Sequence, residues 1–454
     1  MKVFKSKIRK TVVGTTILFL LLIIGVFTIK ERNENCPAVS LISDWYKFML
    51  NAEVETEGFR FPIVARFYAY AGTAAYAVGT SKKNVDYIGL EEMFDDLNSI
   101  PKPDKNIQVL PALNACYAEI CRLFFIGGKN NLDNENKKLF DKWNNKFNKS
   151  GEYNEIKSSI EFGTKVAQTI FNWSATDQIA HRAELAVYDT NYKFDTLPGV
   201  WRASVRFPLP PMLPNWGKAR RFIANSSDLL SPPPTPYSID QNSKFYKEAL
   251  EIYAIHNPLT QDNRWIAEFW DDDHPGQVFS HPGHWVSIAL QVFQKERPPL
   301  ELMIECMFKL GISLNDAAVN CWNSKYTYKL ERPEHYIQQY IDPNWEPLGV
   351  SPPHPSYPSG HSTFGSAAAE ILTFYFGNSY KLTDESHESR TIYKVKSRKF
   401  NSFREMALEN SLSRMFLGVH YKTDCDEGRR LGEQIGKTVV NFPVKHSEIH
   451  TLAN

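Results

Sequence analysis

Apolar residues recur at helical spacing along most of this 454-residue chain. Such stripes run through residues 63–78, 113–125, 244–270, 300–325 and 403–417. The alternating apolar and polar pattern of a half-buried strand does not recur, and no internal repeat is visible. The pattern therefore predicts an all-α fold, in which each helix buries one face.

Three segments interrupt this periodicity and are predicted to connect helices. Residues 198–237 are rich in proline and tryptophan, so we expect an irregular connection across the surface. A structured loop of that length is unusual unless it covers a site. Residues 128–155 are rich in lysine and asparagine, which is typical of exposed connections and short helices, and the polar residues 378–402 predict a loop.

Residues 1–32 have the pattern of a signal sequence or a membrane anchor. Five cations precede an apolar run from Val12 to Ile29, and charged residues close it. The run is near the lower length limit for a spanning helix, and the positive charge before it directs the rest of the chain outward. We therefore expect an exported protein, periplasmic or extracellular, that stays attached to the membrane if this segment is not cleaved.

The net charge and the cysteine content narrow the classes of partner and of metal site that the sequence allows. The formal net charge is +1, and no basic tail or basic–aromatic repeat is present, so a nucleic-acid partner is not expected. The six cysteines lack the Cys-x-x-Cys spacing of a metal knuckle. In an exported domain some could form disulfides, but so large a domain can equally bury them as free thiols.

A tight turn that opens into a helix lies at Pro358-Ser359-Gly360-His361. Apolar residues follow it at helical spacing through residues 364–375. The start of a helix offers unbonded backbone N–H groups and the positive end of the helix dipole. This arrangement suits a tetrahedral oxyanion.

Three cations from other segments could reach the same anion. Lys325 ends an apolar helical stripe, and Arg332 follows after six intervening residues, with Pro333 predicted to stop the helix. Arg414 lies on the inward stripe of residues 403–417. A lysine at the end of a stripe can extend to water, so convergence of these cations requires the chain to turn between them.

Two histidines, His361 and His420, can move protons or bond the central atom of the anion. Asp424 follows His420 by four residues and can accept the N–H of its imidazole, which would fix the ring nitrogen that faces the site. Taken singly, each of these residues has a structural reading as a turn, a helix cap or a core histidine. The ordered combination is far more specific.

A further group of acids and histidines lies between Asp271 and His284. These residue types could suggest a metal site. Their spacing fits no ligand template, however, and proline and glycine interrupt the segment, so a loop near the site is the favoured interpretation.

The residues from Lys325 to Asp424, taken in order, resemble the signature of the vanadium-dependent haloperoxidases. This family belongs to the superfamily that also contains membrane phosphatidic acid phosphatases and bacterial acid phosphatases. Similarity to exported bacterial haloperoxidase-like proteins extends to four other stretches, at 66–76, 198–201, 266–270 and 282–285.

The resemblance implies a fold and a division of the chain. It implies two four-helix-bundle-like units with long irregular loops. The N-terminal helical region would span residues 37–240 and include the covering loop. The catalytic helical bundle, with a vanadate or phosphate site, would span residues 241–443.

The resemblance also implies the cofactor and the residues that hold it. Vanadate oxygens would be bound by Lys325, Arg332, Ser359, Gly360 and Arg414. His420 would bond the vanadium, oriented by Asp424, and His361 would act as acid–base.

Two aromatic side chains, Trp322 and His354, would line the halide side of the site. The implied reaction is the oxidation of halide by hydrogen peroxide to a hypohalous acid equivalent, with a small organic acceptor possible. A histidine at position 354 resembles the bromide- or iodide-oxidising members. An acid in the preceding loop, Asp273, corresponds to a carboxylate that pairs with the arginine at position 332.

Two other functions remain open from the sequence. The same residues bind phosphate, so an exported acid phosphatase is the alternative, with His420 as nucleophile and His361 protonating the leaving group. A non-catalytic, membrane-tethered oxyanion-binding protein is the third, although binding alone would not require both histidines. The sequence leaves the oligomeric state undetermined.

Overall fold

The computed structural model describes residues 37–448 except 82–85, 98, 104–105, 129–130, 150–151, 205, 225–228, 389, 391 and 394–396. The predicted signal or anchor segment, residues 1–32, lies outside this part of the chain. Among the helices that are described, none is both long enough and apolar enough to cross a membrane.

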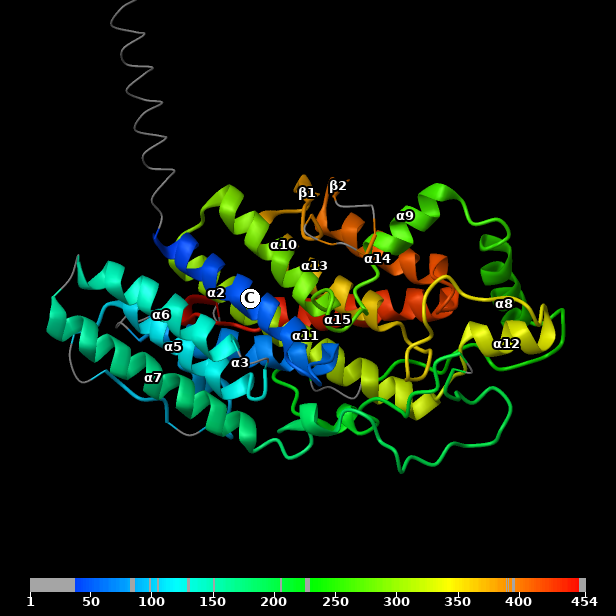
Figure 1. The fold of residues 1–454 in the computed structure, drawn as a ribbon, viewed down its shortest axis with the longest axis horizontal. Coiled ribbons are helices and arrows are strands. Elements are labelled where there is room, and N and C mark those ends of the chain that lie inside the picture. Colours follow the sequence, from blue (N-terminus) through cyan, green and yellow to red (C-terminus); the bar gives the residue numbers. More distant parts are fainter. Residues whose placement is uncertain are drawn as a thin grey trace, which may run out of the picture.

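The described chain is mostly helical, which confirms the predicted all-α fold (Figure 1). In chain order its helices are α2 (Pro37–Glu55), α3 (Phe61–Gly79), α4 (Leu90–Met93), α5 (Val109–Phe124), α6 (Leu132–Asn148), α7 (Tyr153–Ala175), α8 (Lys244–Ile255), α9 (Gln261–Phe269), α10 (His281–Glu296), α11 (Leu300–Tyr328), α12 (Pro333–Tyr340), α13 (Gly360–Phe376), α14 (Phe403–Phe416) and α15 (Lys422–Asn441). Two 3-10 turns, η1 (Ala183–Ala186) and η2 (Trp216–Lys218), and two short strands, β1 (Leu382–Asp384) and β2 (Arg398–Phe400), complete it.

The 29-residue helix α11 runs through the middle of the molecule, and α3 packs along it (Figure 1). Glycines allow the two backbones to approach closely. A Cβ atom on Gly72 would lie 2.8 Å from the carbonyl oxygen of Met307, and one on Gly311 would lie 2.5 Å from that of Tyr68. The N-terminal region is thereby joined to the helix that carries Lys325.

The pair α13 and α15 is packed as closely, through glycines four residues apart on one face of α15. Cβ atoms on Gly428, Gly432 and Gly436 would lie 2.6, 2.2 and 2.8 Å from carbonyl oxygens of α13 and its N-cap. Side chains of ordinary size cannot occupy these positions without separating the helices. The start of α13 is therefore held against the start of α15, where Asp424 lies.

Helices α5, α6 and α7 gather at one end of the molecule, whereas α8 and α12 lie at the other (Figure 1). The expectation of short helices within residues 128–155 was wrong, because α6 is a single helix of 17 residues. Only a few apolar residues of α6 are buried, among them Leu132, Trp143 and Phe147. Charged residues lie between them, so the helical period was not visible in the sequence.

One hydrophobic core extends from α2 to α15 and crosses position 240. It includes Trp45 of α2, Phe67 of α3, Phe308 of α11 and Leu431 of α15. The boundary at residues 240 and 241 thus remains a prediction, and the two regions share a core whatever its position.

The connection at residues 198–237 is irregular apart from η2, as expected. It is anchored by Asp316 of α11, whose buried carboxylate accepts hydrogen bonds from three consecutive backbone N–H groups, those of residues 222–224. Met212, just before η2, accepts hydrogen bonds from the indole of Trp322 and the hydroxyl of Tyr326. The connection therefore lies against the predicted halide side of the site.

Two local expectations were wrong. The polar segment 378–402 contains an antiparallel ribbon of β1 and β2, with Leu382 opposite Phe400. Pro333 does not end a helix but begins α12, a position where its missing N–H costs nothing. Helix α11 ends instead at Lys329, which adopts a left-handed conformation with φ of 50°.

Candidate oxyanion site

The N-terminus of α13 forms the floor of the candidate site. Ser359 is the N-cap, and its hydroxyl oxygen accepts from the backbone N–H of Ser362 at 3.4 Å. The backbone N–H of Ser359 donates to the carbonyl oxygen of Asp424 at 2.9 Å. Gly360 and His361 begin the helix and are buried. The positive end of the dipole is thus enclosed rather than facing bulk water.

Lys325 reaches this region from the last turn of α11. Its ammonium donates to the carbonyl oxygens of Pro355 and Ser356, both at 2.8 Å, and its side chain is fully buried. Burial lowers the pKa of Lys325 to about 7. A bound anion would stabilise the charged form, so anion binding and protonation of Lys325 are linked.

Arg332 is buried and is held by a rigid set of partners. Its Nη1 donates to the carbonyl oxygen of Val419 at 2.7 Å, and its Nε and Nη2 donate to that of His354 at 3.1 and 3.0 Å. Its Nη1 also lies 3.3 Å from Nε2 of His420. Burial lowers the pKa of Arg332 to about 10, so the guanidinium is charged at neutral pH.

Arg414 and His361 approach from α14 and α13. Nη1 of Arg414 donates to the carbonyl oxygen of Trp270 at 3.3 Å. The ring of His361 stacks on that of His281, with centroids 3.9 Å apart. Burial, and then the charge of Arg414, hold the pKa of His361 well below its ordinary value. His361 is therefore neutral.

His420 is oriented by Asp424, as the sequence predicted. Nδ1 of His420 lies 2.9 Å from Oδ2 of Asp424, which also accepts from the hydroxyl of Ser356 at 2.5 Å and the backbone N–H of Tyr421 at 3.1 Å. Burial raises the pKa of Asp424 to about 6, so it is mainly ionised at neutral pH and accepts the Nδ1–H. This assigns the tautomer of His420 in which Nε2 carries a lone pair.

The predicted cations converge on His420. Burial, followed by the charges of Arg332, Lys325 and Arg414, holds the pKa of His420 well below its ordinary value. These three side chains therefore surround one small region. A tetrahedral oxyanion placed there would meet three cations, helix N–H groups and one imidazole lone pair.

Buried atoms without hydrogen-bond partners provide a test of this fit. They include Nε2 of His354, Nε2 of His361 and Nε of Arg414. Buried polar atoms in folded proteins are nearly always paired, so unpaired atoms around a cationic pocket indicate a missing polar ligand. The residues present thus fit a group that both accepts hydrogen bonds and carries negative charge.

The predicted halide side is an aromatic corner. The rings of Trp322 and His354 lie 4.9 Å apart, and Nδ1 of His354 lies 3.0 Å from Nη2 of Arg332. Phe61, at the start of α3, completes the corner. The centroid of its ring lies 5.3 Å from that of Trp322 and 5.8 Å from that of His354. The sequence prediction missed Phe61, which comes from the other half of the chain.

Two more residues of the surroundings, His281 and Arg60, were not predicted as parts of the site. His281 lies between Phe61, at 4.4 Å, and His361, at 3.9 Å. Arg60 precedes Phe61. Burial raises the pKa of Asp273, and the charge of Arg60 opposes this rise more strongly than the charge of Arg414 does. After burial, the pKa of Arg332 depends mainly on the charges of Asp424 and Arg414, and the charge of Asp273 has a smaller effect on it. The only sequence signal for Arg60 and Phe61 was their position directly before a strongly apolar helix.

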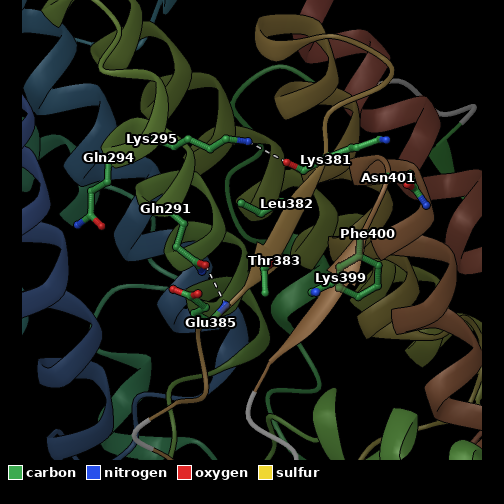
Figure 2. Close-up of a pocket in the computed structure, with 10 residues that line it drawn as sticks. All are labelled: Gln291, Gln294, Lys295, Lys381, Leu382, Thr383, Glu385, Lys399, Phe400 and Asn401. Carbon is green, nitrogen blue, oxygen red and sulfur yellow. Dashed lines mark hydrogen bonds between the residues drawn. The ribbon is translucent and has the colours of Figure 1, made fainter. Parts of the chain in front are cut away.

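A small cavity of about 130 Å³ borders the site at Arg414. Its lining includes Arg414, Asp273, Arg60 and Phe61, together with Met212 of the covering connection. A larger cavity of about 660 Å³ lies elsewhere, between α10 and the β1–β2 ribbon (Figure 2). None of the predicted site residues lines that second cavity.

Comparisons with known proteins agree with the fold. The family model of the VCPO second helical-bundle domain matches residues 305–448. The vanadium chloroperoxidase of Curvularia inaequalis is 23% identical over an alignment of 353 positions, which covers 60% of this chain. This chain spans 57% of the length of that curated relative.

Solved structures extend the likeness to almost the whole described chain. The crystal structure of the first bacterial vanadium-dependent iodoperoxidase is 27% identical, with a TM-score of 0.80, over 90% of this chain and 97% of that one. A bacterial vanadium-dependent chloroperoxidase in its holo form has a TM-score of 0.64 over 87% of this chain and 93% of its own, but at 16% identity it supports the fold alone. Together with the family model, these matches show that the chain is similar to the vanadium-dependent haloperoxidases in fold and in its second helical bundle.

Proposed function

We propose that this protein is a vanadate-dependent haloperoxidase, which oxidises iodide or bromide with hydrogen peroxide to a hypohalous acid equivalent. The observation that carries the proposal is the state of His420. Its Nδ1–H is held by Asp424, so that Nε2 turns its lone pair toward a buried group of three cations, with Nη1 of Arg332 at 3.3 Å. A ligand bond to vanadium requires such a lone pair.

The residues around His420 supply complementary charge and hydrogen bonds. Lys325, Arg332 and Arg414 would balance the negative charge of vanadate, while Ser359 and the N–H of Gly360 would donate to its oxygens. When bound, vanadate supplies a Lewis acid that makes hydrogen peroxide electrophilic toward halide.

His361 is suited to move protons beside this group. It is neutral, and its buried Nε2 has no hydrogen-bond partner. Nε2 can accept a proton as hydrogen peroxide enters and return it to the departing oxygen. The stack on His281 holds the ring in place during both transfers.

The halide is proposed to approach from the aromatic corner of Phe61, Trp322 and His354. A large polarisable anion is tolerated beside aromatic edges, and iodide is the most polarisable of the halides considered. The likeness to a bacterial iodoperoxidase supports the same choice. Hydrogen peroxide and halide are thus the proposed substrates, and a small organic acceptor would react with the product.

The sequence of residues 1–32 supports an exported protein, and we propose a periplasmic or extracellular location on that basis.

A cationic pocket of this kind also binds phosphate. An acid phosphatase, with Nε2 of His420 as nucleophile, is therefore the function against which the proposal must be tested.

The decisive experiment compares both reactions on one preparation. The purified full chain is dialysed against a chelator and divided, and one half is loaded with orthovanadate. Peroxide-dependent oxidation of iodide, bromide and chloride is then assayed beside hydrolysis of p-nitrophenyl phosphate. We expect halide oxidation only after loading, fastest with iodide, and its loss in His420→Ala but not in the control His181→Ala.

Other results would overturn the proposal. Phosphate release without any halide oxidation would identify a phosphatase. Retention of vanadate without either reaction would identify an oxyanion-binding protein. Undiminished turnover in the His420→Ala variant would remove the role given to that imidazole.

A further inference from the structure

A buried cluster of two histidines and two aspartates lies beside the oxyanion site. Asp272 precedes α10, His284 belongs to α10, Asp384 ends β1, and His387 follows β1. Their exposed fractions are 3, 0, 0 and 1%, respectively. The sequence favoured a loop without a metal for the segment that contains Asp272 and His284, because its spacing fits no ligand template; His387 lies about a hundred residues further along the chain.

Three of these side chains point potential metal ligands at one another. One ligand atom each of Asp272, His284 and His387 lies within 4.8 Å of the others. Oδ2 of Asp272 is 2.9 Å from Nδ1 of His284, and Oδ1 of Asp272 is 3.0 Å from Nε2 of His387. Ligands of a tetrahedral zinc ion stand about 3.3 Å apart, so a small shift would suffice to admit the ion.

The contact between Asp272 and His387 is close but poorly aligned. Oδ1 of Asp272 and Nε2 of His387 are 3.0 Å apart, and neither atom has a partner that meets hydrogen-bond geometry. A poorly aligned pair of buried polar atoms leaves room for a shared third partner. The two rings also stand at 69° to each other, with centroids 4.4 Å apart, as around a common centre.

Asp384 provides the outer support that metal-bound histidines usually have. Its Oδ2 lies 2.8 Å from Nε2 of His284, the ring nitrogen that faces away from Asp272. Gln291 in turn donates to Oδ1 of Asp384 at 3.1 Å. A carboxylate on the second ring nitrogen fixes the tautomer and makes the first nitrogen a stronger donor.

The donor set also indicates the kind of ion and its route of access. Two imidazoles and one carboxylate suit borderline transition metals, whereas calcium and magnesium prefer oxygen ligands alone. A cavity of about 340 Å³, lined in part by Glu53 and Ser280, reaches Asp272. A small cation can therefore reach the carboxylate without passing the oxyanion pocket.

We propose that Asp272, His284 and His387 bind one divalent transition-metal ion of the zinc class, with Asp384 holding the imidazole of His284. Three protein ligands leave one place in a tetrahedral shell, for water or for the second oxygen of Asp272. The ion joins the loop after α9, helix α10 and the turn after β1. The same loop carries the carbonyl oxygen of Trp270 that binds Arg414, so the ion also supports the oxyanion site.

The competing explanation is an ion-pair network without metal. Burial alone would lower the pKa of His284, but the carboxylates of Asp272 and Asp384 raise it to about 9. A protonated His284 between two carboxylates would satisfy those three residues. It does not account for the poor alignment of the contact between Asp272 Oδ1 and His387 Nε2.

The test uses the full chain without vanadate. The protein is dialysed against a chelator, incubated with zinc sulfate alone and desalted, and zinc per chain is measured by mass spectrometry. We expect one equivalent in the wild type. We expect zinc affinity to fall about tenfold or more in His387→Ala and in Asp384→Asn, with no change in the control His181→Ala.

X-ray absorption at the zinc edge of the wild type gives a second measurement that does not depend on a variant folding. A shell of nitrogen and oxygen ligands with two imidazoles is expected. Wild-type protein that retains no zinc would overturn the proposal in favour of the ion-pair network. Equal retention by the wild type and a folded His387→Ala would assign the ion to another site, with the same consequence.

Discussion

At the scale of single residues, the chemistry depends on which nitrogen of His420 faces the pocket. Asp424 decides this, because its Oδ2 collects three hydrogen bonds and accepts the Nδ1–H. An asparagine at position 424 can turn its amide and donate to Nδ1, which would move the proton of His420 to Nε2 and block the lone pair. Asp424 therefore acts through His420 as a positioning residue.

We accordingly expect Asp424→Asn to weaken vanadate binding about 10- to 100-fold, the range typical of outer-shell partners. Equilibrium dialysis of vanadate, followed by analysis for vanadium, measures this directly. The control is Asp426→Asn, two residues further along and paired with Lys422 and Arg429 at the surface. Unchanged vanadate affinity in Asp424→Asn would contradict the tautomer assigned to His420.

Much of the residue-level site could be predicted, for a specific reason. Lys325, Arg332 and Arg414 are cations on inward or interrupted helical stripes, and such placement is costly unless an anion is bound. Phe61 and His281 could not be predicted in the same way. An aromatic ring at a helix start looks like core packing. Phe61 reaches Trp322 because α3 packs on α11, and His281 reaches His361 because α10 packs on α13.

At the scale of elements, close contact of α13 with α15 determines the distance between the oxyanion floor and His420. Gly428, Gly432 and Gly436 make that contact possible. The periodicity of the sequence predicted both helices but not their separation, because a glycine within a helix reads as a weak helix former rather than as a contact.

Gly432→Ala tests this contact. Its Cβ would lie 2.2 Å from the carbonyl oxygen of Thr363, so the helices must move apart. We expect the free energy of unfolding to fall by about 1–3 kcal/mol, with a parallel loss of vanadate affinity. Urea denaturation and vanadate dialysis measure the two effects. Lys437→Ala, on the exposed face of the same helix, should change neither.

If Gly432→Ala leaves both quantities unchanged, the helix spacing does not set the site geometry.

The ribbon of β1 and β2 could not be predicted from the sequence pattern either. Its strands have three residues each, too short for an alternating pattern to be visible, and tertiary contacts with α10 support them.

At the scale of the whole molecule, the shared core makes the two predicted regions depend on each other. Helix α3 of the N-terminal region covers α11 of the catalytic region, and the same hydrophobic cluster continues into α15. Separation of the regions would expose much of the buried face of α11 to water.

We therefore expect the full chain to unfold in one cooperative thermal transition. Differential scanning calorimetry should give a van't Hoff enthalpy equal to the calorimetric enthalpy. Gly311→Ala, whose Cβ would lie 2.5 Å from the carbonyl oxygen of Tyr68, should lower the temperature of that whole transition. Two separate transitions, with only one of them shifted by the variant, would show that the regions fold independently.

The described cysteines bear on how the molecule would withstand the product of the proposed reaction. Hypohalous acids attack sulfur, and thiolates react fastest. All five of these thiols are free and buried, and burial raises the pKa of each: Cys116, Cys121, Cys306, Cys321 and Cys425. Even Cys321, one helical turn before Lys325, is enclosed with its Sγ 3.7 Å from the carbonyl oxygen of Pro358. If the proposed reaction releases a diffusible oxidant, it would find these thiols shielded, so self-inactivation through them should be slow.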